Sequence, residues 1–271
     1  MPIGTAQAGS GPAWSRVATP SEGPPQVIGS AADGCIAGAA TLPPDGPGYE
    51  AIRLSRHRNF GHPATIRFVE RLGREAQAAG LPIFYVGDMA QPRGGPMSWG
   101  HRAHENGLDV DIWFNLEPKK LLPVAARETL DLPSMVLPGG KAIDPHRFGG
   151  AQITLLRLAA ADPHVDRIFV NPAIKQQLCQ TTTGDRSWLR LIRPWWGHAA
   201  HFHIRFRCPA GQPECVQGPP PPPGDGCDAS LRWWFDQLDQ PPKPPSPPRP
   251  PPALPAACRA IMDAPPAPAR H

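Results

Sequence analysis

The spacing of apolar residues predicts three helices in the middle of the chain. From Pro63 to about Ala79, apolar side chains recur every three or four positions, which is typical of a helix with one buried face, and Gly80 ends the pattern. A second pattern of this kind covers residues 151–161, and a third helix is expected from about Pro172. These segments supply the helical part of the fold.

Four short segments predict strands, at residues 81–87, 109–114, 167–170 and 201–207. Two of them alternate between faces, because successive side chains on a strand point to opposite sides. In the first, the apolar face holds Val110, Ile112 and Phe114, and the other face holds Asp109, Asp111 and Trp113. In the second, the apolar face holds Phe202, Ile204 and Phe206, and the polar face holds His201, His203, Arg205 and Arg207. The mixture predicts an α+β fold with a central, largely antiparallel sheet flanked by helices.

Proline indicates where the packed domain begins and ends. The chain has 40 prolines, many of them after residue 215, in runs that favour an extended polyproline conformation and cannot build a core alone. Residues 1–60 hold only short apolar pieces between glycines and prolines, which predicts loops and short strands. We therefore expect a flexible segment over 1–24, a domain with the chemistry over 25–210, and a Pro-rich extension over 211–271.

The six cysteines favour disulfides and an oxidising compartment. They form no Cys-x-x-Cys pair, which argues against a thiolate zinc site or a redox motif. Four of them, from Cys208 to Cys258, lie in or beside the Pro-rich region, where disulfides would hold the extension to the domain. Residues 1–20 show no signal peptide and no segment reaches membrane-spanning length, so export is inferred from the cysteines alone. The net charge of +4, without Lys/Arg runs, gives no reason to expect nucleic-acid binding.

Five of the ten histidines fall in two short windows, residues 99–113 and 195–205. In the second window, His201 and His203 lie two positions apart on a predicted strand, so both face one site. One of the two can bind a metal while the other stays free beside it.

The first window supplies further metal ligands. A loop carries His104 and a strand carries Asp111, with Gly107 between them where the chain must turn. Two imidazoles and one carboxylate make a zinc site with three protein ligands and an open position for water. Zinc lowers the pKa of bound water and polarises a carbonyl, which is what a hydrolase needs. A His-x-His pair on a strand often arises by chance, but its combination with His-x6-Asp around a glycine is far rarer.

These residues resemble the penicillin-insensitive murein endopeptidases, within the wider group of lysostaphin-like, D-Ala-D-Ala-type and hedgehog-type zinc domains. The resemblance covers roughly residues 25 to 260, and its motifs are highly specific. The matching stretches are residues 34–36, 87–89, 101–113, 167–179, 193–209 and 224–227.

The resemblance implies hydrolysis of D-alanyl–meso-diaminopimelyl cross-links in periplasmic peptidoglycan. It makes His104, Asp111 and His203 the zinc ligands. It places His201 where the family has an active-site histidine beside the metal, and this is our choice for the general base or transition-state stabiliser. His198 matches a further active-site histidine that orients or hydrogen-bonds.

His101 matches a histidine that binds a second zinc in some members of the family. The partners of that second metal, an Asp and a His spaced three apart, are missing from residues 131–141, so the sequence favours one zinc over two. The resemblance also implies the disulfides Cys35–Cys258, Cys179–Cys227 and Cys208–Cys215, one of the fifteen pairings that six cysteines allow.

Two other functions remain open on the sequence. A D-Ala-D-Ala carboxypeptidase or dipeptidase would keep the fold, but such relatives usually carry a Glu near the second window, and this chain has none there. A zinc-stabilised cell-wall binding module without catalysis is the other, although the open zinc position and a free His201 favour an enzyme. The sequence leaves open whether the protein forms a homodimer.

Two tryptophan pairs have no assigned role in the chemistry. Trp195 and Trp196 either line a substrate groove or pack against the domain, and the sequence favours neither. Trp233 and Trp234 are expected to dock the extension on the core.

Three polar residues on the predicted strands lie beside the proposed site. Arg205 and Arg207 either bind a substrate carboxylate or end a solvated strand. Asp109 is expected to support a ligating histidine, as neighbours of metal ligands commonly do.

Overall fold

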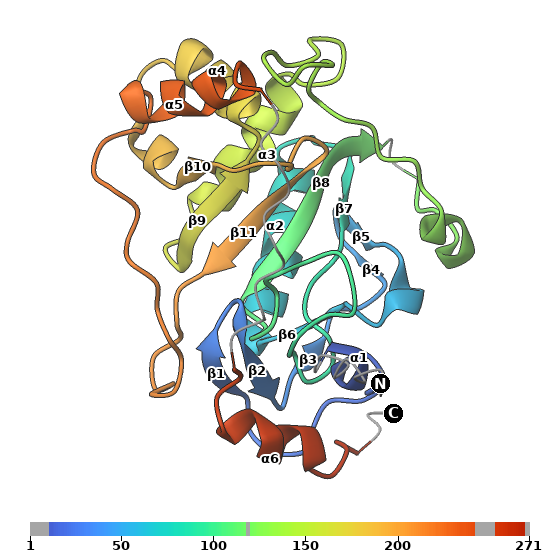
Figure 1. The fold of residues 1–271 in the computed structure, drawn as a ribbon. Coiled ribbons are helices and arrows are strands. Elements are labelled where there is room, and N and C mark those ends of the chain that lie inside the picture. Colours follow the sequence, from blue (N-terminus) through green and yellow to red (C-terminus); the bar gives the residue numbers. More distant parts are fainter. Residues whose placement is uncertain (1–10, 118–119, 242–252, 269–271) are drawn as a thin grey trace, which may run out of the picture.

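A seven-stranded mixed sheet forms the centre of the computed structural model, which describes residues 11–117, 120–241 and 253–268 (Figure 1). The strand order is β10-β9-β11-β8-β7-β5-β4. The strands are β4 (Asp45–Gly46), β5 (Tyr49–Ala51), β7 (Ile83–Val86), β8 (Asp109–Glu117), β9 (Val165–Val170), β10 (Ile192–Pro194) and β11 (His201–Phe206). Only the pairs β10–β9 and β5–β7 are parallel, and the other four neighbouring pairs are antiparallel. The predicted α+β fold with a largely antiparallel sheet is confirmed.

Helices α2 (Pro63–Ala78) and α3 (Gly150–Ala160) cover one face of this sheet. Helix α2 begins where the sequence predicts, because Pro63 needs no hydrogen-bond acceptor at the first helical position and the His62 side chain accepts from the Ala64 amide. Phe68 of α2 packs edge-on against Phe206 of β11, with ring centroids 4.8 Å apart. The apolar faces of β8 and β11 therefore point toward the helices, and their polar faces point away.

The remaining elements surround this central layer. They are the hairpin β1 (Gln26–Ser30) and β2 (Asp33–Ala37), the pair β3 (Ala40–Thr41) and β6 (Phe60–Gly61), and helices α1 (Gly11–Trp14), α4 (Pro172–Thr181), α5 (Ala229–Leu238) and α6 (Ala257–Asp263). Short 3₁₀ turns occupy Leu54–Arg56, Val124–Glu128 and Ser187–Arg190.

A second, smaller core joins the two ends of the chain. Trp14 is buried there with Cys35 and Ile261, although it lies in the segment expected to be flexible. Helices α1 and α6 lie near one another at the same end of the molecule (Figure 1). Residues 242–252, which contain much of the expected polyproline run, lie outside the described residues. None of the helices in the described ranges is both long and apolar enough to cross a membrane.

Three disulfides join the extension to the domain. Cys35 of β2 bonds to Cys258 of α6, and Cys179 of α4 bonds to Cys227 just before α5. Cys208 and Cys215 close a short loop after β11. These are the three pairs that the family resemblance implies.

Candidate metal centre

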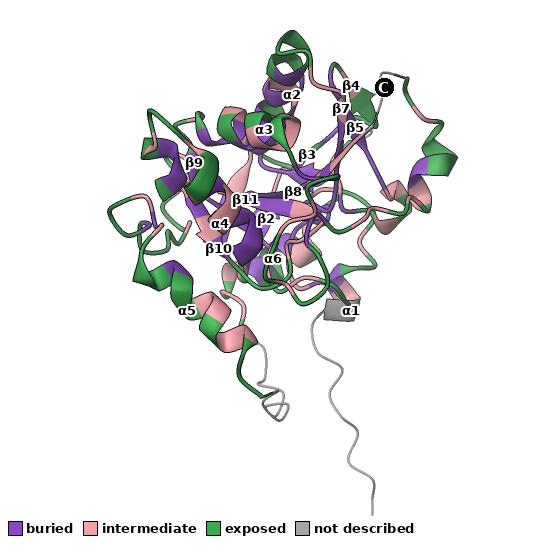
Figure 2. Ribbon diagram, turned by 90° about the horizontal axis from the view of Figure 1, so that it is seen from above, coloured by how far each residue is buried: buried purple, intermediate pink, exposed green. Residues whose placement is uncertain are grey.

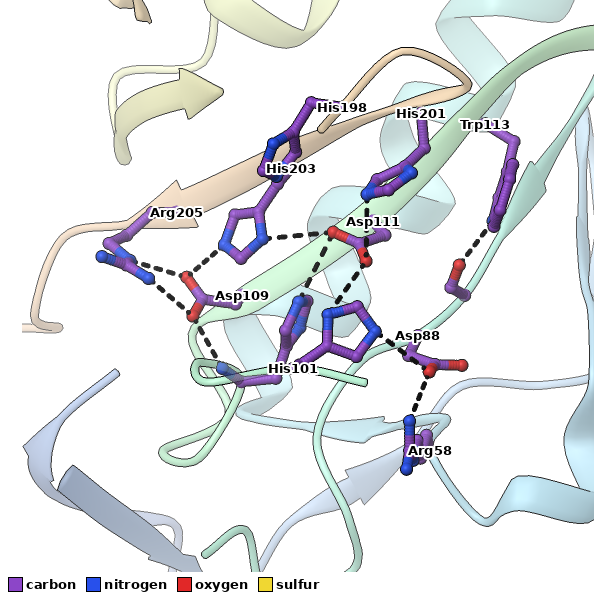
Figure 3. A network of polar contacts seen from close by, with 12 residues as sticks. Arg58, Asp88, His101, Asp109, Asp111, Trp113, His198, His201, His203 and Arg205 are labelled. Atoms are coloured by element: carbon purple, nitrogen blue, oxygen red, sulfur yellow. Dashed lines mark hydrogen bonds and ion pairs between the residues drawn. The ribbon is translucent and has the colours of Figure 1, made fainter. Parts of the chain in front are cut away.

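The register between β8 and β11 assembles the polar face of the sheet into one site. In this antiparallel pair His203 stands opposite Asp111, and Arg205 stands opposite Asp109. Directly paired residues share a face at short Cβ separation. Two segments 90 residues apart in the sequence thus bring an imidazole against one carboxylate and a guanidinium against another (Figure 3).

The loop before β8 delivers His104 to the same place. His104 has a φ of 70°, a left-handed conformation that is uncommon for residues other than glycine, and its side chain is fully buried. Its backbone amide donates to Asp109 Oδ2 over 3.0 Å. Gly107 has a φ of 78°, and a Cβ there would collide with Ile36. The glycine expected to turn the chain is therefore required by both conformation and space.

Histidine nitrogens converge on the carboxylate of Asp111. Its Oδ1 lies 3.4 Å from Nε2 of His104 and 3.2 Å from Nδ1 of His203. Its Oδ2 lies 3.7 Å from Nδ1 of His101 and 3.6 Å from Nε2 of His201. Potential ligand atoms of His101, His104 and Asp111 all lie within 4.8 Å of one another. His101, which the sequence analysis assigned to a second metal, thus adjoins the same group as the proposed ligands.

The donor atoms of this group fit a divalent cation. Both ring nitrogens of His104 and Oδ1 of Asp111 are buried without a hydrogen bond among the described residues. Buried polar atoms normally have hydrogen-bond partners, so such unsatisfied atoms call for an explanation such as an ion. Imidazole nitrogens with a carboxylate oxygen are ligands typical of zinc.

The buried carboxylates and imidazoles of the group shift one another's pKa values. Burial raises the pKa of Asp111, but the neighbouring His104 and His201 outweigh burial and hold it well below its usual value. Burial lowers the pKa of His203, but the carboxylates of Asp109 and Asp111 outweigh burial and raise it to about 9. A cation that binds His203 must therefore displace a proton that these carboxylates stabilise.

Asp109, two residues before Asp111 on β8, contacts both His203 and Arg205. Its Oδ1 lies 3.1 Å from Nε2 of His203, and its two oxygens accept from the guanidinium of Arg205 at 2.9 and 3.2 Å. The contact with His203 is the one that the sequence analysis expected. The guanidinium of Arg205 is engaged with Asp109, so Arg205 does not end a solvated strand, and its binding of a substrate carboxylate stays a prediction. Arg207, one pleat further on, is exposed.

His201 lies at the open side of the group. Its ring centroid is 5.0 Å from that of Trp113, and its side chain keeps about a fifth of its surface exposed. Burial lowers the pKa of His201, and Asp111 offsets this only in part. The ring is therefore neutral near pH 7 and able to accept a proton.

His198 stands beside His201, with ring centroids 5.1 Å apart. It has a φ of 50°, so two histidines of the site adopt a left-handed backbone, the kind of local strain that is concentrated at functional sites. Its Nδ1 lies 2.8 Å from the carbonyl oxygen of Trp196. A carbonyl can only accept, so Nδ1 carries the proton and Nε2 is the free nitrogen. Burial, followed by the nearby His201 and His203, lowers the pKa of His198 to about 4.

Asp88 is a site residue to which the sequence analysis gave no role. Its Oδ2 lies 3.2 Å from Nε2 of His101 and 2.8 Å from Nη1 of Arg58 (Figure 3). Arg56 contacts both carboxylate oxygens. The sequence did offer one signal for Asp88: it directly follows the predicted strand 81–87 and lies in the matching stretch 87–89. Two histidines outside the two windows lie away from this group: His62 caps α2, and His164 contacts Asp162.

Known proteins resemble this chain over most of its length. The family model described as penicillin-insensitive murein endopeptidase matches residues 27–263. Proteins named penicillin-insensitive murein endopeptidase from Salmonella newport (strain SL254), Salmonella heidelberg (strain SL476) and Salmonella typhi are each 45% identical to this chain over 250 residues. These alignments cover 92% of this chain and 90% of each relative. The chain therefore belongs to the penicillin-insensitive murein endopeptidase family.

Proposed function

We propose that the protein is a zinc endopeptidase that hydrolyses D-alanyl–meso-diaminopimelyl cross-links of peptidoglycan in the periplasm. The observation that carries the proposal is the convergence of His104 and His203 nitrogens on one oxygen of Asp111, beside two further histidines. The names of the relatives support the substrate class, and three disulfides suit an oxidising compartment.

We assign the zinc ligands to His104, Asp111 and His203. His101 and His203 both approach Asp111, but only His203 is buried, and its second nitrogen faces Asp109. A carboxylate on the far nitrogen fixes the ring and makes the ligating nitrogen more basic. His101 is more exposed and is tied to Asp88, which favours an outer position.

His201 and His198 supply the rest of the proposed chemistry. When bound, zinc makes a water molecule more acidic and polarises the scissile carbonyl. Neutral His201 accepts the proton of the attacking water and returns it to the leaving amine. His198, whose Nε2 is free to accept a hydrogen bond, lies next to His201 and orients the reacting groups.

We also propose the division into a catalytic domain and an extension that the sequence predicts. Residues 25–210 carry all the proposed ligands and active-site histidines. Three disulfides join the extension, residues 211–271, to this domain, and α5 packs against α4. An endopeptidase is favoured over the carboxypeptidase alternative because the second histidine window contains no Glu.

The decisive experiment compares the wild type with His203→Ala, measuring zinc per chain and the products released from purified sacculi. We expect the variant to lose zinc and activity together, while His101→Ala keeps its zinc. His164→Ala is the matched control, because that ring is 78% exposed and contacts Asp162 away from the group. Full lytic activity in zinc-free His203→Ala protein would exclude the mechanism. Mass analysis of digested cross-linked dimers separates endopeptidase from carboxypeptidase products.

A further inference from the structure

Four tryptophans form an exposed cluster next to the proposed active site. Trp195, Trp196 and Trp233 are 53%, 41% and 51% exposed, although tryptophan is on average a highly buried residue. Trp234 joins the cluster, with its ring centroid 6.0, 4.8 and 5.2 Å from those of Trp195, Trp196 and Trp233. We call these four residues the tryptophan cluster.

The cluster is continuous with the histidines. Trp195 packs on Phe169 of β9 with ring centroids 5.6 Å apart, and Phe169 lies 5.4 Å from the ring of His203. The carbonyl of Trp196 accepts from His198. A ligand that reaches the histidines therefore has the indole rings beside it.

Both halves of the cluster are held in place. The Trp195 amide donates to the Val170 carbonyl, which fixes the chain after β10. Helix α5, which carries the other two tryptophans, lies at the edge of the molecule alongside α4 and β10 (Figures 1 and 2). The disulfide Cys179–Cys227 and the side chain of Asp228, which caps α5, anchor its start. Such rigid aromatic rings offer contact area at little cost in conformational entropy.

The two sides of the site differ in charge. On the β7 side, Arg53 stacks over Trp113, and Arg56 and Arg58 stack over Trp99. Of these, Arg53 and Arg56 are partly exposed and suit the carboxylates of stem peptides, whereas Arg58 is buried against Asp88. The tryptophan cluster on the β10 side offers uncharged ring faces. The uncharged part of a peptidoglycan substrate is its glycan chain, whose pyranose rings present flat C–H faces.

The size of the cluster argues against a protein partner. Half-exposed indole rings provide roughly 300–400 Å² in total. A stable protein interface needs about 800 Å² from each partner. An exposed apolar patch of a few hundred Å² is often functional on a monomeric protein.

From this geometry we propose that the tryptophan cluster binds the N-acetylhexosamine chain of peptidoglycan by stacking sugar rings on the indoles, next to the cleavage site. The proposal deepens the proposed function and rests on it for the identity of the natural substrate. It gives the extension, through α5, a direct part in substrate binding.

One test compares two substrates of the zinc-loaded, full-length enzyme: cross-linked peptide dimers that keep their disaccharides, and the same peptides without sugars. For Trp233→Ala we expect kcat/KM to fall about three- to tenfold on the sugar-bearing dimer, the scale of one aromatic contact, and less than about twofold on the bare peptide. Trp233→Tyr should restore most of the loss. Val216→Ala, which removes an exposed apolar side chain beside β1, is the control.

A second test does not depend on catalysis. The tetramer of N-acetylglucosamine is titrated into the full-length, zinc-stripped protein while tryptophan fluorescence is followed. We expect saturable binding that Trp233→Ala weakens at least about threefold. Absence of saturable binding, or an equal loss of kcat/KM on both substrates, would overturn the proposal. So would a Trp233-dependent self-association or binding to phosphatidylglycerol vesicles without sugar binding. An enzyme that cleaves neither substrate but binds the tetramer would contradict the proposed function and leave the glycan site standing.

Discussion

The buried residues around Asp111 and the exposed tryptophan cluster are built in opposite ways. His104, Asp109, Asp111 and His203, which we call the buried cluster, come from or adjoin two central strands, and each is almost fully buried. Their charges face one another at 3 to 4 Å. The tryptophan cluster instead comes from a turn and a peripheral helix held by a disulfide. Changes in the buried cluster should therefore abolish chemistry, and changes around the tryptophans should adjust binding and stability.

The largest effect is expected from His201, which lies beside Asp111 at the open side of the buried cluster. His201→Ala should lower kcat about 10²- to 10⁴-fold, the usual contribution of a general acid–base group, while zinc per chain stays unchanged. The steady-state rate and the zinc content of the same sample check this. Loss of zinc in the variant would move His201 into the ligand set and contradict the division proposed above.

Removing Cys179–Cys227 tests whether the tryptophan cluster depends on its anchor. The Cys179→Ser/Cys227→Ser double variant should lose about 2–4 kcal/mol of unfolding free energy, because the bridge closes a loop of 48 residues. Urea unfolding gives the free energy, and the zinc content of the folded variant should remain that of the wild type. Loss of zinc in this variant would show that the buried cluster depends on the disulfide that anchors the tryptophan cluster. Cys208→Ser/Cys215→Ser, with a loop of 7 residues, is the matched control and should cost less.

Asp109 tests how far the buried cluster depends on residues that do not bind the metal. Asp109→Asn removes the charge that faces His203 and Arg205, so zinc affinity should fall about 10- to 100-fold. Competition with a chelator of known affinity measures this. Asp131→Asn, at an exposed position, should leave the affinity unchanged. An unchanged zinc affinity in Asp109→Asn would show that the contact is structural only.

The smallest expected effect is a pH dependence of the free energy of unfolding, caused by Lys175 of α4. Lys175 is buried with its ammonium donating to the carbonyls of Leu189 and Asp225, and burial, followed by Arg193, lowers its pKa to about 7. The unfolded chain keeps this proton up to about pH 10.4. Between these values the unfolded state binds more protons, so this group makes the free energy of unfolding rise with pH, by at most about 1.4 kcal/mol per pH unit.

The check is urea unfolding of the wild type and Lys175→Met at pH 7, 8 and 9. The difference in unfolding free energy between the two proteins should shift in favour of the wild type as the pH rises. A difference that stays constant over this range would contradict a lowered pKa of Lys175. Zinc content should not vary between the two proteins, because Lys175 lies outside the buried cluster.

Much of the fold could be predicted because its signals are local. The spacing of apolar residues identified α2 and α3, and strict alternation separated the two faces of β8 and β11. The strand ends were less certain: β7 is shorter than residues 81–87, and β9 begins at Val165. The second core around Trp14 was missed, because its partners come from opposite ends of the chain.

The candidate site, like the fold, was predicted only where the signal was local. Family motifs pointed to the histidines and Asp111, but the roles of Asp88 and Arg205 depend on contacts that no local pattern encodes. Arg205 meets Asp109 only because β8 and β11 pair in one register. The tryptophan cluster likewise arises from two segments about 40 residues apart that α4 and a disulfide bring together.

The sequence by itself determined which histidines and aspartates share a face of each strand, because side-chain direction on a strand follows from period two alone. Only the tertiary structure decided which of those residues meet. Strand order, register and the docking of α5 result from burial and pairing between distant segments, and these interactions form only in the folded chain.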